Sequence, residues 1–269
     1  MRTRMYDSLN NREIAAYLAR SDVIFLPVGV TEIHGEMPVN AEHVLALGAA
    51  KLLAEAADGL VLPGLAYFYA GATAMGTSTL EVSPSLGAAY LKEICRSLLR
   101  RGFRRQVLLT AHGPASVTVS VVVREFFNET RCPIAYVDLI KPISELNQKA
   151  PGKICFDKLI WGAYRVLERM DEIPQDQRPI QRAPYPEAFA KLQQKCSAAG
   201  FYYTDESQHG WWPEAPMSAA DRAARAEEGE RQLRELAAFM KPAELVEAMR
   251  EADRLVSEVI VPKFGSRLP

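Results

Sequence analysis

The chain has 269 residues, of which 48% are hydrophobic and 24% charged, and its formal net charge is -1 at pH 7. A chain of this length can bury a substantial core, and the composition is ordinary for a soluble globular protein. Nucleic-acid binding needs a basic patch, and no basic block occurs in the sequence. No stretch is typical of a transmembrane helix, and the N-terminus lacks the apolar centre of a signal peptide. We therefore expect neither nucleic acid nor a membrane as a partner.

The cysteines indicate the redox compartment. They are scattered along the chain without a Cys-x-x-Cys pair, which argues against a disulfide framework and against a zinc–sulfur site. We expect reduced thiols in a cytoplasmic protein. The residues are Cys95, Cys132, Cys155 and Cys196.

The first third of the chain alternates helical and strand patterns. Apolar residues at helical spacing predict a short helix over residues 8–20. The apolar run that begins at Val23 leaves no room for a helical period and predicts a strand buried on both faces. A helix is expected over 42–57 and a short strand over 60–62. Residues 66–85 combine aromatic residues with glycines, which predicts a loop or edge strand close to a ligand or another backbone.

The alternation continues up to residue 141. Helices are expected over 84–99 and over 116–130, the second despite valines that lower helix propensity. Strands are expected over 107–110 and 134–139. Such alternation is typical of βαβ units, and it predicts an α/β fold with a mainly parallel central sheet.

The pattern is weaker beyond residue 141. A less regular excursion is expected at about 141–215, with a helix near 156–170, and two C-terminal helices are expected at about 218–260. No internal repeat or clear linker interrupts the chain. We therefore predict a single domain over residues 1–269.

Polar side chains follow two of the predicted buried strands. Glu32 and His34 come after the first strand, and residues two apart in an extended segment point to the same side. His112 follows the strand over 107–110 and, like His34, directly precedes a glycine. Ligands bind beyond the carboxyl ends of strands in open α/β sheets, and carboxylate with imidazole suits a divalent metal such as zinc or manganese. The sequence therefore predicts a metal site at these strand ends.

Each histidine, taken alone, could be a structural residue held by hydrogen bonds and not a metal ligand. Several other residues also have two interpretations. Glu42 could bind the metal, or it could be an acidic residue favoured in a first helical turn. Glu36 could act as a base or be solvated. Trp211 and Trp212 could wall a pocket, or they could lie in the core or in a subunit interface. Ser116 lacks a nucleophile-elbow motif, which argues against a serine hydrolase.

These motifs resemble those of the creatininase (creatinine amidohydrolase) family. That family has a strand ending in a Pro-x-Gly-x-x-Glu-x-His-Gly turn, which residues 27–35 match. Its Leu-Pro-x-x-x-Asp element at a helix entrance is similar to residues 37–42, and its Gly-Thr stretch is similar to residues 76–77. A Gly-Phe-Arg signature with a strand and Asn-Gly-His-Gly is similar to residues 102–113, and a C-terminal pattern is similar to residues 210–229. The likeness is good over roughly the first half of the chain.

The resemblance implies a three-layer α/β/α fold, often assembled as a hexamer built from dimers, and hydrolysis of a cyclic amide or related C–N bond by bound divalent metal. Glu32, His34 and His112 would occupy three ligand positions, and Glu42 stands where the family has a bridging Asp. Pro114 replaces a glutamate ligand of creatininase itself, and we find no counterpart of the later His-Ala-Gly-Glu segment of other members, whose nearest match by position is residues 161–163. One or two metal ions are therefore both compatible with the sequence.

We predict a metal-dependent hydrolase that acts on a small cyclic amide or a related cyclic carbonyl compound, with zinc or manganese as cofactor and a homo-oligomeric assembly. One alternative is a metal-dependent lyase, isomerase or ring-opening hydrolase acting on a cyclitol or sugar-like ketone. Another is a non-catalytic, ligand-binding family member. The expected metal ligands are Glu32, His34, Glu42 and His112; the candidates for proton transfer are His209 and Glu36; the candidates for substrate binding are His43, Tyr69, Thr73 and Trp211.

Overall fold

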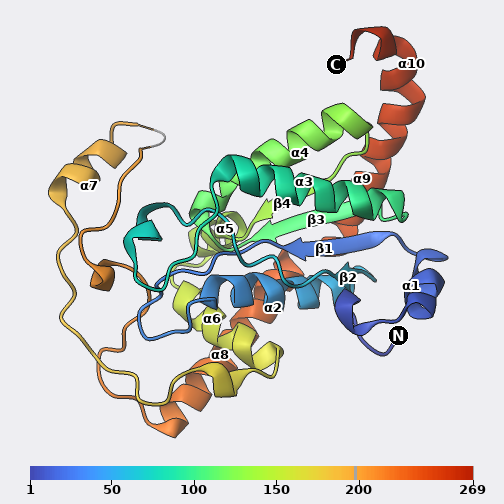
Figure 1. Ribbon diagram of the computed structural model, residues 1–269. Helices are drawn as coiled ribbons and strands as arrows, with labels where there is room; N and C mark the ends of the chain where they lie inside the picture. The colour runs from blue at the N-terminus through green and yellow to red at the C-terminus, as the bar shows by residue number, and fades with distance from the viewer. Residues whose placement is uncertain (197–198, 269) are drawn as a thin grey trace.

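The computed structural model describes residues 1–196 and 199–268 and shows a parallel sheet between two layers of helices (Figure 1). The four strands in the described residues lie in the order β2-β1-β3-β4, and each neighbouring pair is parallel. The predicted three-layer α/β/α fold is therefore confirmed. The strands are β1 (Val23–Pro27), β2 (Leu60–Val61), β3 (Arg105–Thr110) and β4 (Ala135–Asp138).

The side chains of β1 alternate between two cores. Val23 and Phe25 pack in the core beneath one helical layer, whereas Ile24 and Leu26 pack in the core of the other. This alternation follows from the two-residue period of a strand, and burial on both faces explains the continuous apolar run. The first layer contains α2 (Ala41–Ala56), α6 (Phe156–Val166) and α8 (Ala219–Phe239), and the second contains α1 (Asn11–Leu18), α3 (Pro84–Arg100) and α4 (Ser116–Thr130).

Two helices begin at side-chain caps. Asn10 caps α1 by accepting a hydrogen bond from the Glu13 backbone amide, while the Glu13 side chain accepts one from Asn10. Ser218 and Asp221 form the same reciprocal capping box at the start of α8. Each box satisfies backbone N–H groups that a helix start leaves unpaired.

The segment 141–215 is more regular than expected. It contains most of α5 (Ile140–Lys149), the predicted α6, and the short α7 (Glu187–Gln193). Helix α5 packs Ile143 and Leu146 in the same core as α6. Residues 174–186 are irregular, as predicted, and the part of the chain around α7 projects from the body of the molecule (Figure 1).

The remaining segments agree broadly with expectation. The stretch 66–85 is a loop with a 3₁₀ turn over Gly71–Met75 and an isolated bridge from Thr31 to Leu80. At the C-terminus, α9 (Pro242–Leu255) continues through a π-helical turn into α10 (Val261–Phe264). No helix among the described residues combines the length and apolarity needed to cross a membrane. The single-domain organisation stays a prediction.

Glycines allow α6 and α8 to pack backbone against backbone. A Cβ atom at Gly162 would overlap the backbone of Gly229, and one at Gly229 would overlap the carbonyl oxygen of Lys158. Any side chain at either position must therefore separate the two helices.

We expect Gly229→Ala to lower the free energy of unfolding by about 3 kcal/mol, because overpacking a backbone contact outweighs the gain in helix propensity. Gly265→Ala is the control, since its Cβ would meet only Val261 Cγ1, at 3.8 Å. Urea unfolding followed by circular dichroism measures both variants. Equal stability of Gly229→Ala and the parent would contradict the tight crossing of α6 and α8.

Candidate metal centre

The strand order places a switch point between β1 and β3. The chain moves from β1 outward to β2, then returns to place β3 on the other side of β1. The carboxyl ends of β1 and β3 therefore meet at one edge of the sheet, where ligands bind in folds of this type. Glu32 and His34 follow β1, and His112 follows β3. Glu42 lies in the first turn of α2 at the same edge.

Four side chains converge at this edge. Glu32, His34, Glu42 and His209 each offer one ligand atom, and these atoms all lie within 4.8 Å of one another. Glu32 is 1% exposed, whereas the His209 side chain is 21% exposed. The structure thus brings together three predicted ligands and one residue that was predicted to transfer protons.

His112 contacts the two carboxylates of this cluster. Its Nδ1 atom lies 2.7 Å from Glu42 Oε2 and 3.3 Å from Glu32 Oε1. The Thr73 hydroxyl donates a hydrogen bond to Glu32 Oε2. On the other oxygen of Glu32, His209 Nε2 lies 3.4 Å from Oε1. Glu32 is therefore the residue to which the other members of the site are connected.

Burial and neighbouring charges shift the pKa values of Glu32 and His112 in opposite directions. Burial raises the pKa of Glu32, but hydrogen bonds from His112 and His209 outweigh it and lower the pKa to about 2. Burial lowers the pKa of His112, but hydrogen bonds to Glu32 and Glu42 and their negative charge outweigh it and raise the pKa to about 10. Burial lowers the pKa of His34, which favours the neutral imidazole that metals bind. In the metal-free chain, the proton on His112 balances part of the negative charge.

The unsatisfied atoms of the cluster fit a metal ion. Among the described residues, His34 Nδ1 is buried without a hydrogen-bond partner, and Glu32 Oε1 and His209 Nε2 meet only across a long contact of 3.4 Å. Polar atoms buried in this way are costly unless something binds them. Two carboxylates and two imidazoles form a donor set that suits zinc or manganese.

Two His-Gly turns dock against each other and bring His209 to the strand ends. The Trp211 backbone amide donates a hydrogen bond to the His34 carbonyl over 3.3 Å, and the Glu36 amide donates one to the Trp211 carbonyl over 2.9 Å. Gly35 and Gly210 have φ values of +66° and +84°, and a Cβ atom on either would overlap the opposite backbone. Glycine is therefore required at both positions for conformation and for space.

The site encloses a cavity of about 140 Å³. Tyr203 closes one side of it, with its ring centroid 5.7 Å from that of His209 and its backbone amide bonded to the Ala72 carbonyl over 3.0 Å. Tyr203 lies in the segment that was expected to be a less regular excursion and was not among the predicted site residues; the aromatic run before His209 was the available signal. The lining residues are Glu32, Glu42, Ala70, Ala72, Thr73, His112, Gly113, Pro114, Tyr203 and His209.

The other predicted site residues lie outside this cavity. His43 is buried against Gly29, and burial lowers its pKa to about 4. Glu36 is half-buried in the turn after His34. Tyr69 lines a neighbouring cavity.

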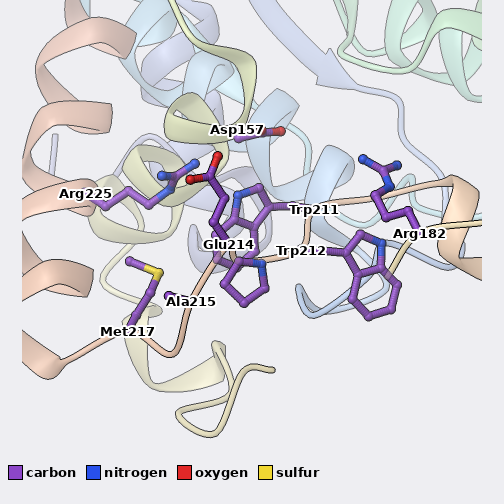
Figure 2. A pocket seen from close by; sticks show the side chains of 10 residues that line it. Asp157, Arg182, Trp211, Trp212, Glu214, Ala215, Met217 and Arg225 are labelled. Atoms are coloured by element: carbon purple, nitrogen blue, oxygen red, sulfur yellow. The ribbon is translucent and has the colours of Figure 1, made fainter. Parts of the chain in front are cut away.

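Trp211 packs away from the metal centre. Its ring lies 5.6 Å from that of Trp161 and 5.0 Å from the Arg225 guanidinium carbon. Figure 2 shows Trp211 and Trp212 in a separate pocket with Arg225 and Glu214. The structure therefore places Trp211 beside the docked His-Gly turns, and its predicted contact with substrate gains no support from this position.

The sequence model of the creatininase family, described as creatinine amidohydrolase, matches residues 7–172. The creatinine amidohydrolase of Pseudomonas putida is 30% identical over 202 residues, which cover 65% of this chain and 76% of that protein. The chain belongs to the creatininase family. The predicted resemblance is confirmed, and with it the class of metal-dependent hydrolases acting on C–N bonds other than peptide bonds.

Further proteins are similar to this chain in sequence or in structure. The 3-dehydro-scyllo-inosose hydrolase of Thermotoga maritima is 26% identical over 136 residues, which cover 50% of this chain and 43% of that protein. A mutant creatininase complexed with creatine has a TM-score of 0.63 at 22% identity, covering 93% of this chain and 98% of the other. A mutant creatininase of Zn-Zn type and a creatininase with Mn both have TM-scores of 0.62, at 22% and 21% identity and with the same coverage. These structures share the fold of the chain.

We expect Gly210→Ala to weaken zinc binding at least tenfold, because the new methyl group would displace His209 from Glu32 and His34. Gly64→Ala is the matched control: Gly64 has a φ of +91°, but a Cβ there would meet nothing within 4 Å. Both variants pay a cost for a left-handed residue, and only Gly210→Ala loses the docking contact. Isothermal titration with zinc compares them, and equal affinities would contradict the role of the docked turns.

We expect the free energy of unfolding of the metal-free protein to fall as the pH rises from 6.5 to 10. The folded chain keeps the proton on His112, whose pKa is about 10, whereas the unfolded chain releases it near pH 6.5. One such proton lowers the free energy of unfolding by up to about 1.4 kcal/mol for each unit of pH.

The variant His112→Gln should lose this contribution in urea titrations across the same pH range. His43→Gln is the control, since the pKa of His43 is lowered to about 4 and its contribution is lost only as the pH falls from 6.5 to 4. A parent and a His112→Gln variant with identical slopes above pH 6.5 would refute the proton assignment.

Proposed function

We propose that this chain uses a divalent metal ion to hydrolyse a small cyclic amide or a related cyclic carbonyl compound. The observation that carries the proposal is the convergence of Glu32, His34, Glu42 and His209 within 4.8 Å at the switch point of a creatininase-family sheet. The zinc and manganese forms of creatininase, and its complex with creatine, support the cofactor and the substrate class.

The buried donors Glu32, His34 and Glu42 would hold the ion. When bound, a divalent ion polarises a carbonyl oxygen and lowers the pKa of a water molecule. Thr73 fixes one oxygen of Glu32 by its hydrogen bond, which leaves Oε1 directed at the imidazoles. Once it has lost its proton, His112 can serve as a further ligand, as the sequence predicted.

We assign the proton transfer to His209. Its Nε2 lies 3.4 Å from Glu32, and its side chain is more exposed than those of the other cluster members. A partly exposed imidazole can take a proton from attacking water and give it to a leaving nitrogen. The Tyr203 ring lies beside the His209 ring, with the two planes tilted by 32°.

A ring-opening hydrolase of a cyclitol or sugar-like ketone is the second candidate. The relative from Thermotoga maritima is named for such a substrate, although the chain spans less than half of that protein. The two candidates are separated by offering cyclic amides and cyclitol ketones to the same metal-loaded protein.

We also propose a cytoplasmic homo-oligomer. Cys95 and Cys132 are buried as free thiols, which agrees with a reducing compartment. Leu86 and Tyr90 expose 62% and 57% of their surface on α3, and apolar side chains of this size on one helix suit an interface between copies.

We expect the purified protein, reconstituted with zinc or manganese, to retain about one to two equivalents of metal in elemental analysis. Glu32→Gln and His34→Ala should each retain at least tenfold less, because each removes a buried donor. Glu36→Gln is the matched control, since Glu36 lies outside the cluster and its loss should leave the metal content unchanged. A parent that binds neither metal would refute the hydrolase mechanism and favour a non-catalytic role.

A further inference from the structure

A second cavity adjoins the metal centre. It has a volume of about 540 Å³, compared with about 140 Å³ for the cavity that contains the metal-binding cluster. The two cavities share three lining residues, namely Ala72, Pro114 and Tyr203. The inner cavity is the smaller of the two, and a substrate larger than a small ring can extend from it into the outer cavity.

The outer cavity is aromatic and uncharged. Tyr69, Phe201 and Tyr203 line it together with Pro114 and Val117. No charged side chain lines it in the part of the chain that the structure describes. Pockets of this size that combine apolar walls with few polar groups are typical of sites for small organic ligands. The walls favour a flat apolar group and disfavour an ionised one.

Pro114 makes the boundary between the two cavities apolar. It stands two residues after His112, and its Cγ atom would lie 3.1 Å from a Cβ atom at Gly71. The φ of +74° at Gly71 lets the chain turn closely around the proline ring. A charged residue at position 114 would project between the cluster and the outer cavity, whereas proline leaves a neutral passage.

The aromatic wall is held in place by contacts among its own rings and with the loop below it. The Phe201 and Tyr203 ring centroids are 6.2 Å apart, and Tyr185 lies edge-on to both, at 6.3 Å and 6.0 Å. The backbone hydrogen bond from Tyr203 to Ala72 ties this wall to the loop below it. Because these contacts fix the rings, binding of a flat group loses little conformational freedom.

We propose that the substrate carries an aromatic or similarly flat apolar substituent, which occupies the outer cavity while the reacting carbonyl lies at the metal centre. This inference rests on the proposed function, because the metal fixes one end of the substrate. It narrows the substrate class from small cyclic amides in general to those with an uncharged apolar substituent.

Two metal-chelating probes test the inference without a known substrate. Acetohydroxamate reaches the metal alone, whereas 3-phenylpropanohydroxamate adds a phenyl group on a short chain. With zinc-loaded protein and isothermal titration, we expect the phenyl compound to bind about ten- to a hundredfold more tightly, as expected for burial of a phenyl-sized apolar group.

Val117→Asp should remove most of that gain while leaving acetohydroxamate binding unchanged, because it places a charge in the outer cavity. Val121→Asp is the matched control: both valines lie on α4 and are similarly exposed, at 48% and 41%, but Val121 does not line the cavity. Phe201→Ala gives a second variant that shortens the aromatic wall without adding charge.

The outcomes separate the two proposals. Equal affinities for the two probes in the parent would overturn the apolar subsite and leave the metal centre intact. An equal loss of the phenyl gain in Val117→Asp and Val121→Asp would also overturn it, because the effect would not be local to the cavity. Absence of binding by both probes would refute the metal centre and, with it, the inference.

Discussion

The close docking of two His-Gly turns is the constraint on which the site depends. Gly35 follows the strand-end residue His34, and Gly210 follows His209 on a distant segment; neither could accept a side chain. Their backbones are joined by hydrogen bonds through Trp211. The ends of β1 and α2 position Glu32, His34 and Glu42, whereas His209, the fourth member of the cluster, reaches them only because these two turns touch.

The same contact imposes an electrostatic cost that the chain offsets locally. Two carboxylates and three imidazoles lie together with little access to solvent, and Glu32 accepts contacts from Thr73, His112 and His209. Without metal, opposite charges on Glu32 and His112 stabilise each other. Because a metal ion must compete with that proton, metal binding and proton release are coupled in this site.

Much of the framework could be predicted from local sequence patterns. The apolar runs of β1 and β3 and the Glu32, His34 and His112 side chains after them are local features, and the parallel sheet brings them together. The position of His209 depends on docking between segments far apart in sequence, for which no local pattern exists. Helix α5 was missed because its apolar signal consists of little more than Ile143 and Leu146, and α7 because it is short and buries no residue.

The family match ends at residue 172, before the segment that carries the aromatic wall and His209. The donors at the strand ends therefore come from one part of the chain, and the enclosure of the substrate comes from another. The aromatic wall itself is joined to the loop after β2 by the Tyr203–Ala72 hydrogen bond, so its side chains can vary without disturbing the strand-end donors. Substitutions at Phe201 and Tyr203 could therefore change which substituent fits the outer cavity, while the strand-end donors and the docked His209 stay in place.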